Sequence, residues 1–174
     1  MTLSAARLAA GALLLTLAAC ATAPPRPAPD LVGRLAVRIE AHAGQPARSF
    51  STQFALRGDA QTGSLQLTTP LGSTAAQARW QPGLAELTTP EGTRRFADLD
   101  TLAEDLLGQA LPLAALIDWL RGRAWPGAPS AARDGGFEQL AWRIDLSRFA
   151  EGWVVAGRDT APALSVRARL ERPE

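Results

Sequence analysis

The sequence predicts a mainly β protein, in which a strongly curved antiparallel sheet or incomplete barrel is covered at its opening by two short helices. Between residues 33 and 97, apolar and polar residues alternate in several runs, which is the period of half-buried strands. The period becomes helical between residues 101 and 122 and returns to alternation from residue 137. Helices that separate two runs of strands indicate a helical layer packed on one face of the sheet.

Residues 1–19 are typical of a bacterial lipoprotein signal peptide. Arg7 provides a weak positive charge, and Leu8–Leu17 form an apolar core too short to span a bilayer. Leu17-Ala18-Ala19-Cys20 then matches a lipobox, in which small residues precede a cysteine that receives lipid. Cys20 is the only cysteine, so it has no disulfide partner within the chain. We therefore expect lipidation of Cys20 rather than an ordinary secretory signal.

Residues 20–30 are expected to comprise the lipidated cysteine and a proline-rich tether. The prolines at positions 24, 25, 27 and 29 favour an extended chain, which reaches up to ~30 Å at roughly 3.1 Å per residue. The remaining residues 31–174 are sufficient for one domain with its own core.

The composition excludes several classes of function. After loss of Arg7 with the signal peptide, 17 arginines balance 17 acidic residues, which argues against a general nucleic-acid binder. The single histidine, His42, lies in a polar loop, and the chain lacks the metal, serine-hydrolase and phosphate-binding motifs. We therefore predict no enzyme activity, no catalytic residue, no metal site and no cofactor.

The first run of strands has the pattern of a meander. Leu35, Val37 and Ile39 share one face of the first strand, and Ala76, Ala78 and Trp80 continue the alternation after the central turn. The expected strands are Gly33–Glu40, Arg48–Leu56, Gly63–Thr69, a strand ending at Trp80, Leu84–Thr88 and Thr93–Ala97.

A leucine occupies the tip of the central hairpin. Thr69-Pro70-Leu71-Gly72 fits a type I turn, with proline second and glycine fourth. The same frame recurs at Thr89-Pro90-Glu91-Gly92 with a glutamate at the tip, and in a meander both tips lie at the same end of the sheet. Leu71 either folds back onto neighbouring side chains or contacts an apolar partner, and the residues alone leave both interpretations open.

Two amphipathic helices are expected next. Thr101–Glu104 matches a capping box, Leu102 and Leu106 are one turn apart, and Gly108 stops the first helix. Asp98 and Asp100 lie near this helix start, where carboxylates favour the helix dipole.

Pro112 suits the first turn of the second helix, which Arg121-Gly122 end. Its apolar residues Leu113, Leu116, Ile117 and Leu120 recur at helical spacing. Such helices pack as core or form a lid over the sheet opening.

The C-terminal part predicts a loop followed by three strands. Gly122–Gly136 is rich in glycine and proline and is expected to be the loop. Phe137–Leu146 is expected to be one strand with Leu140, Trp142 and Ile144 on a shared face. Gly152–Ala156 and Ala163–Leu170 predict the last two strands.

Five short strings occur in order along the chain: Gly33-Arg34-Leu35-Ala36-Val37-Arg38, Leu67-Thr68-Thr69-Pro70-Leu71-Gly72-Ser73-Thr74, Leu111-Pro112-Leu113, Trp119-Leu120-Arg121-Gly122 and Gln139-Leu140-Ala141-Trp142. These strings and their order resemble the LolB family of outer-membrane lipoproteins. Two departures are Ala141, where the family often has glycine, and the end at Pro173-Glu174, which lacks a usual final tryptophan.

This resemblance implies an unclosed barrel of about eleven strands with a helical lid over a hydrophobic cavity. It implies a monomeric, lipid-anchored protein on the periplasmic face of the outer membrane. Such a protein accepts lipoproteins from a periplasmic carrier of the LolA type and inserts them into the inner leaflet. A tethered assembly lipoprotein that grips an envelope protein through an edge strand, and a lipocalin-like lipid carrier, are the alternatives.

The resemblance also assigns candidate residues. It implies that Pro70, Leu71 and Gly72 form a loop that contacts the membrane during insertion, which favours the functional interpretation of Leu71. The cavity wall is expected among Leu35, Val37, Phe50, Phe54, Leu65, Leu67, Leu106, Leu116, Ile117, Leu120 and Trp142.

Overall fold

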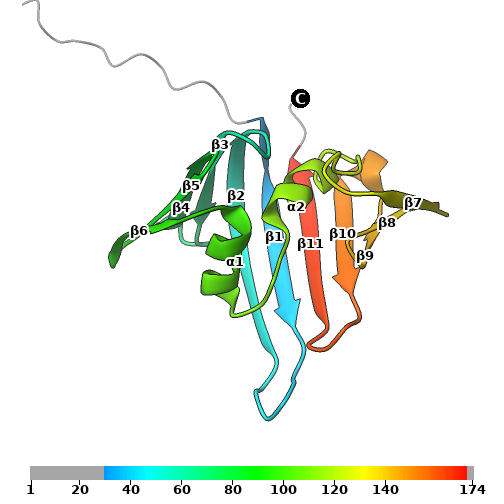
Figure 1. The fold of residues 1–174 in the computed structure, drawn as a ribbon, viewed down its shortest axis with the longest axis horizontal. Coiled ribbons are helices and arrows are strands. Elements are labelled where there is room, and N and C mark those ends of the chain that lie inside the picture. The colour runs from blue at the N-terminus through cyan, green and yellow to red at the C-terminus, as the bar shows by residue number, and fades with distance from the viewer. Residues whose placement is uncertain (1–29, 172–174) are drawn as a thin grey trace, which may run out of the picture.

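Eleven antiparallel strands form one strongly curved sheet in the computed structural model, which describes residues 30–171 (Figure 1). The sheet order is β6-β5-β4-β3-β2-β1-β11-β10-β9-β8-β7, so β6 and β7 are open edges and the barrel is unclosed. The expected fold class is therefore confirmed. The strands are β1 (Leu31–Ile39), β2 (Arg48–Gly58), β3 (Gly63–Thr68), β4 (Thr74–Gln81), β5 (Leu84–Thr89), β6 (Gly92–Phe96), β7 (Ser130–Arg133), β8 (Gly136–Gln139), β9 (Trp142–Asp145), β10 (Trp153–Arg158) and β11 (Leu164–Glu171).

The meander expected in the first half is confirmed, and β1 joins the two halves of the sheet. β1 pairs with β2 on one side and with β11 on the other, with Val37 opposite both Phe50 and Val166. The expected signal peptide (residues 1–19), Cys20 and the expected tether up to residue 29 lie outside the described residues.

Two helices, α1 (Leu99–Leu107) and α2 (Leu113–Trp119), lie over one face of the sheet (Figure 1). This face carries the buried residue of each alternating pair, such as Val37 on β1, Leu56 on β2 and Val166 on β11. The helices and this face of the sheet form the hydrophobic core. None of the helices in residues 30–171 is both long and apolar enough to cross a membrane.

The start of α1 differs from the expected capping box. Asp98 is the N-cap, and its Oδ1 accepts a hydrogen bond from the Thr101 backbone N–H at 2.7 Å. This hydrogen bond holds the pKa of Asp98 below its usual value. The expected cap at Thr101–Glu104 was wrong, because aspartate caps helices as readily as threonine and Asp98 precedes Thr101 by three residues. The earlier start brings Leu99 onto the buried face of the helix. Gly108 ends α1 in a left-handed conformation, as expected.

Helix α2 begins where expected and ends slightly earlier. The Pro112 carbonyl accepts a hydrogen bond from the Leu116 N–H at 2.9 Å, so Pro112 serves as the N-cap. The helix ends at Trp119, and the next residues form tight turns up to Gly122. Leu116, Ile117 and Leu120 are all buried.

Two expectations for the C-terminal half were wrong. Ser130–Arg133 was expected to be loop but forms the edge strand β7. Phe137–Leu146 was expected to be one strand but forms the β8–β9 hairpin, with Leu140 and Ala141 in its turn. The alternation continues across this two-residue turn because Phe137 pairs with Ile144 and Gln139 with Trp142. Leu140, expected on the buried face, is 43% exposed.

Gln139 is a buried polar residue that ties the hairpin to the loop after α2. Its Oε1 accepts hydrogen bonds from Trp119 Nε1 at 2.8 Å and from the Trp125 N–H at 2.9 Å. Its Nε2 donates to the carbonyls of Trp125 and Ala128, both at 2.7 Å. All four polar groups lose a partner if this side chain is removed.

We therefore expect Gln139→Leu to destabilise the fold by roughly 2–4 kcal/mol, because it conserves volume but leaves buried polar groups unpaired. Chemical denaturation followed by tryptophan fluorescence measures the change. The matched control is Gln53→Leu on the exposed side of β2, for which we expect a change below about 0.5 kcal/mol. Equal midpoints for the two variants would contradict the role of Gln139.

Candidate functional site

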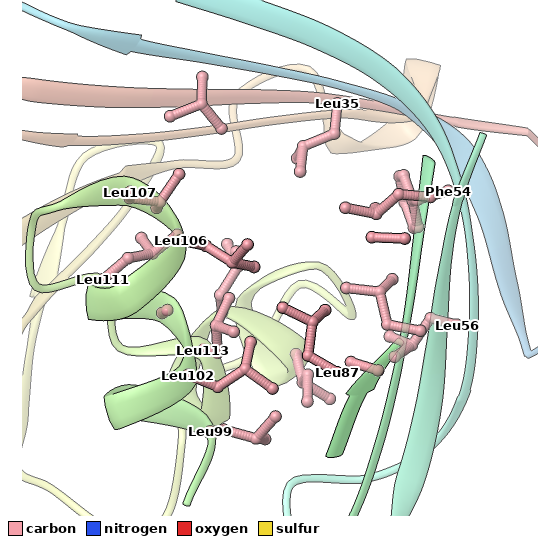
Figure 2. A pocket seen from close by; sticks show the side chains of 18 of the residues that line it. Leu35, Phe54, Leu56, Leu87, Leu99, Leu102, Leu106, Leu107, Leu111 and Leu113 are labelled. Atoms are coloured by element: carbon pink, nitrogen blue, oxygen red, sulfur yellow. The ribbon is translucent and has the colours of Figure 1, made fainter. Parts of the chain in front are cut away.

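A cavity of about 310 Å³ lies between the two helices and the first five strands (Figure 2). Every side chain that lines it is apolar. The lining residues are Leu35, Val37, Phe50, Phe54, Leu56, Leu65, Leu67, Ala76, Ala78, Trp80, Leu87, Leu99, Leu102, Ala103, Leu106, Leu107, Leu111, Leu113, Leu116, Ile117 and Leu120.

One wall of the cavity is formed by helix residues and the other by strand residues, and each set follows the periodicity of its element. Figure 2 shows Leu102 and Leu106, one helical turn apart on α1, directed toward the sheet. Phe54 and Leu56, two residues apart on β2, are directed toward the helices. Alanines at positions 76, 78 and 103 also line the wall, and their short side chains leave space that larger residues would fill.

This chemistry selects the kind of ligand. A wall without charged or hydrogen-bonding side chains cannot compensate a polar ligand for lost hydration, whereas it accommodates an aliphatic chain. Within residues 30–171, no group of three His, Cys, Asp or Glu residues could hold a metal ion. The cavity is therefore suited to hydrocarbon.

The cavity opens to the surface at Phe50 and Leu106, which we call the cavity mouth. Each lines the cavity and is 41% exposed. Polar contacts hold α1 and the following loop to the sheet around this mouth. Arg48 Nη2 donates to the Leu107 carbonyl at 2.9 Å, and Arg158 Nη1 donates to the Ala110 carbonyl at 3.2 Å.

The lid is also fixed at the sheet edge. Arg94 on β6 forms an ion pair with Asp105 on α1, with 2.6 Å between Nη1 and Oδ2. All these links involve solvent-accessible groups, whose net contribution to stability is small. The lid is thus held mainly by apolar burial, with polar links along its rim.

Ten of the eleven residues expected in the cavity wall do line it, and Trp142 does not. Trp142 is 2% exposed and packs against Trp119, with 5.8 Å between ring centroids. No residue of β7–β11 is among the lining residues, because this half of the concave face is filled by side chains. Eleven of the lining residues were not among those expected, and one of them, Leu56, shares the alternation of Phe50 and Phe54.

The Pro70-Leu71-Gly72 segment forms the tip of the β3–β4 hairpin. Leu71 is 94% exposed, which excludes the interpretation that it folds back onto its neighbours. The Gly72 N–H donates to the Thr69 carbonyl at 2.9 Å, and the Thr69 N–H donates to the Ser73 carbonyl at 2.8 Å. These bonds hold the leucine on a defined turn.

The second tip, Pro90-Glu91, is not an equivalent turn despite its similar sequence. Thr89 pairs with Gly92, which leaves a two-residue connection. Thr68 pairs with Thr74 instead, after a register shift, so the first tip is a five-residue loop. The two turns therefore differ in length because of their strand pairing, although their sequences are similar.

Comparison with known proteins identifies close relatives of this chain. A family model described as "Outer membrane lipoprotein LolB" matches residues 30–170. The outer-membrane lipoprotein LolB of Bordetella petrii is 36% identical, over 94% of this chain and 84% of that protein. The LolB proteins of Ralstonia nicotianae and Bordetella pertussis are 34% and 40% identical, covering 95% and 68% of this chain and 88% and 63% of those proteins.

We expect Leu106→Gln to weaken binding of an apolar fluorescent probe about five- to tenfold with little loss of stability, since Leu106 borders the cavity but is half exposed. Titration of the probe and thermal melting measure the two effects. Leu140→Gln is the matched control, because Leu140 is equally exposed but does not line the cavity.

Equal probe affinity for the Leu106→Gln and Leu140→Gln variants would show that the probe binds elsewhere.

A charged residue in place of the buried Ile117 or Leu120 should instead unfold the domain.

Proposed function

The chain belongs to the LolB family and is an outer-membrane lipoprotein that acts as a receptor for lipoprotein insertion, not an enzyme, and from this premise we propose how its residues perform the task. The cavity beneath α1 and α2 binds acyl chains of lipoprotein clients. A periplasmic carrier of the LolA type delivers these clients. The Leu71 tip then contacts the inner leaflet of the outer membrane, into which the acyl chains pass.

The apolar cavity wall is the observation that carries this proposal. Burial of an acyl chain is favourable by about 0.8 kcal/mol per methylene, so a client cannot leave its carrier for water at a useful rate. An apolar cavity gives the acyl chain a hydrocarbon environment in place of the carrier, so the chain can move without a nucleotide or a covalent step. Transfer then proceeds if the bilayer binds the chains more strongly than the cavity does.

The cavity mouth supports entry of acyl chains between lid and sheet. Phe50 and Leu106 expose apolar surface where the cavity meets solvent, so a chain entering there stays in contact with hydrocarbon. The volume of about 310 Å³ lies at the lower end of the range for ligand pockets, about 300–1,000 Å³. Movement of α1 and α2 away from the sheet would enlarge the cavity, at the cost of exposing their buried apolar residues and breaking the polar contacts at the rim.

The exposed Leu71 supports contact with lipid. Burial of one leucine is worth about 1.5–3 kcal/mol, which is too little to hold a free protein on a membrane. A lipid anchor at Cys20 would keep the domain near the surface at high effective concentration, so this energy is sufficient to favour repeated shallow insertion.

The chain between anchor and domain is compatible with this orientation. β1 begins at the end of the sheet opposite the Leu71 tip, because β1 and β3 run in the same direction. The nine residues of β1 span about 30 Å. Residues 21–29 can span a similar distance, at most about 30 Å, so an anchored domain is able to present the Leu71 end to the membrane.

We expect Leu71→Glu to leave folding and client uptake nearly intact but to slow release into bilayers several-fold. The side chain is fully exposed in the folded protein, and a carboxylate does not enter the acyl region. The protein is loaded with a fluorescent acylated client from its carrier, liposomes are added, and the client is followed over time.

Glu91→Leu is the control, because it adds a leucine to another tip at the same end of the sheet. We expect this variant to release client at the wild-type rate. Release by Leu71→Glu at the wild-type rate would refute the insertion role of the tip. Failure of the wild-type protein to take client from the carrier would refute the receptor mechanism and favour an assembly role.

A further inference from the structure

The β8–β9 turn has an unusual composition for its geometry. Gln139 pairs with Trp142, so Leu140 and Ala141 are the whole connection between the strands. Both have positive φ angles, 53° and 62°. Two-residue turns of this kind favour Asn-Gly, because a β-carbon crowds the backbone in the left-handed region. Glycine occupies most of the other positive-φ positions in residues 30–171.

The residues on both sides of this turn are fixed in the core. Gln139 makes its four hydrogen bonds to Trp119, Trp125 and Ala128. Trp142 is buried against Trp119. Since both flanking side chains point inward and are held, the two turn residues must project outward. Leu140 is accordingly 43% exposed and takes no part in the cavity wall.

This turn lies at the same end of the sheet as the Leu71 tip. Every pair of neighbouring strands from β3 across to β8 is antiparallel. The sheet order separates β3 from β8 by six steps, so the two strands run in the same direction. The turns that follow β3 and β8 therefore share one end of the sheet.

We propose that Leu140 is a second membrane-contacting tip, which inserts into the same leaflet as Leu71. This proposal rests on the proposed function, because that function directs this end of the sheet toward the bilayer. A backbone conformation unfavourable for leucine, together with an exposed leucine on a rigid turn, indicates selection for something other than folding. One leucine on a two-residue tip offers little area to a protein, which needs about 800 Å² per partner, but it fits between lipid headgroups.

Two membrane contacts, at Leu71 and Leu140, restrict the orientation of the domain more than one contact does. A domain held at Leu71 alone is free to rotate about that point, so the cavity mouth adopts many orientations relative to the leaflet. A second contact on the far half of the same rigid sheet fixes a line on the membrane surface. The mouth is then held at a restricted set of angles while acyl chains leave it.

The first test measures depth in vesicles of phosphatidylethanolamine and phosphatidylglycerol with the full-length lipidated protein. Single nitroxide labels are placed with Ala141→Cys beside Leu140, Ser73→Cys beside Leu71 and Gln61→Cys in the turn at the opposite end. Collisions with a water-soluble relaxing agent report immersion. We expect labels 141 and 73 to be shielded about tenfold relative to label 61.

The outcomes separate the two proposals. Label 141 in water with label 73 immersed would overturn the second tip and leave the Leu71 mechanism standing. Both labels in water would overturn the second tip together with the membrane contact of the proposed function. Labels 141 and 73 immersed with label 61 in water supports both.

The second test uses Leu140→Asn, because asparagine suits the left-handed conformation and removes the apolar tip. We expect a melting temperature equal to or above that of the wild type, unchanged uptake from the carrier, and release into vesicles slowed several-fold. Wild-type release would overturn the proposal. Loss of uptake from the carrier would overturn it in favour of a site that binds the carrier protein.

Discussion

Two short helices cover the concave face of an eleven-stranded sheet, and they are too small to fill it. α1 has nine residues and α2 has seven, so they extend about 14 and 10 Å. β2 alone, with eleven residues, extends about 36 Å. Close packing over such a face needs more side-chain volume than these helices supply. The hollow beneath the lid follows from this mismatch, and the mechanism that we propose depends on the hollow.

The mismatch is confined to one half of the face. Over β9–β11 Trp119 of α2 packs against Trp142 of β9, and the buried residues of β10 and β11 are aliphatic. Gln139 accepts hydrogen bonds from Trp119 and from the Trp125 N–H, which fixes the loop after α2 against this half. Over β1–β5 the facing residues are all apolar, from alanine to tryptophan, and a cavity remains between them and the helices. The packed half holds α2 in a fixed position through Trp119. The helix α1, attached through rim contacts from Arg48 and Arg94, covers the hollow half, which in the proposed mechanism receives the client.

The same scaffold defines what the molecule presents at one end. Antiparallel pairing directs the β1–β2, β3–β4, β5–β6, β8–β9 and β10–β11 turns to the same end of the sheet, and three of their tips carry Leu71, Glu91 and Leu140. The apolar tips are held by hydrogen bonds or by buried neighbours, so they are rigid before they meet a partner. In the mechanism that we propose, the apolar cavity binds hydrocarbon and the apolar tips of the same sheet direct its release at a membrane surface.

Periodicity in the sequence was enough to predict the strands of the first meander and the two helices, because side chains two apart on a strand, or three to four apart on a helix, share a face. The candidate residues of the cavity wall came from the resemblance to the family, and ten of the eleven line the cavity. The proline and glycine of Thr69–Gly72 likewise predicted the turn there. Which half of the concave face is hollow was decided only by tertiary packing, since Trp142 and Phe54 have the same local pattern but different neighbours across the sheet. The Leu140-Ala141 turn escaped prediction for a related reason. A two-residue turn preserves the alternation, and only the pairing of Gln139 with Trp142 reveals that the chain reverses there.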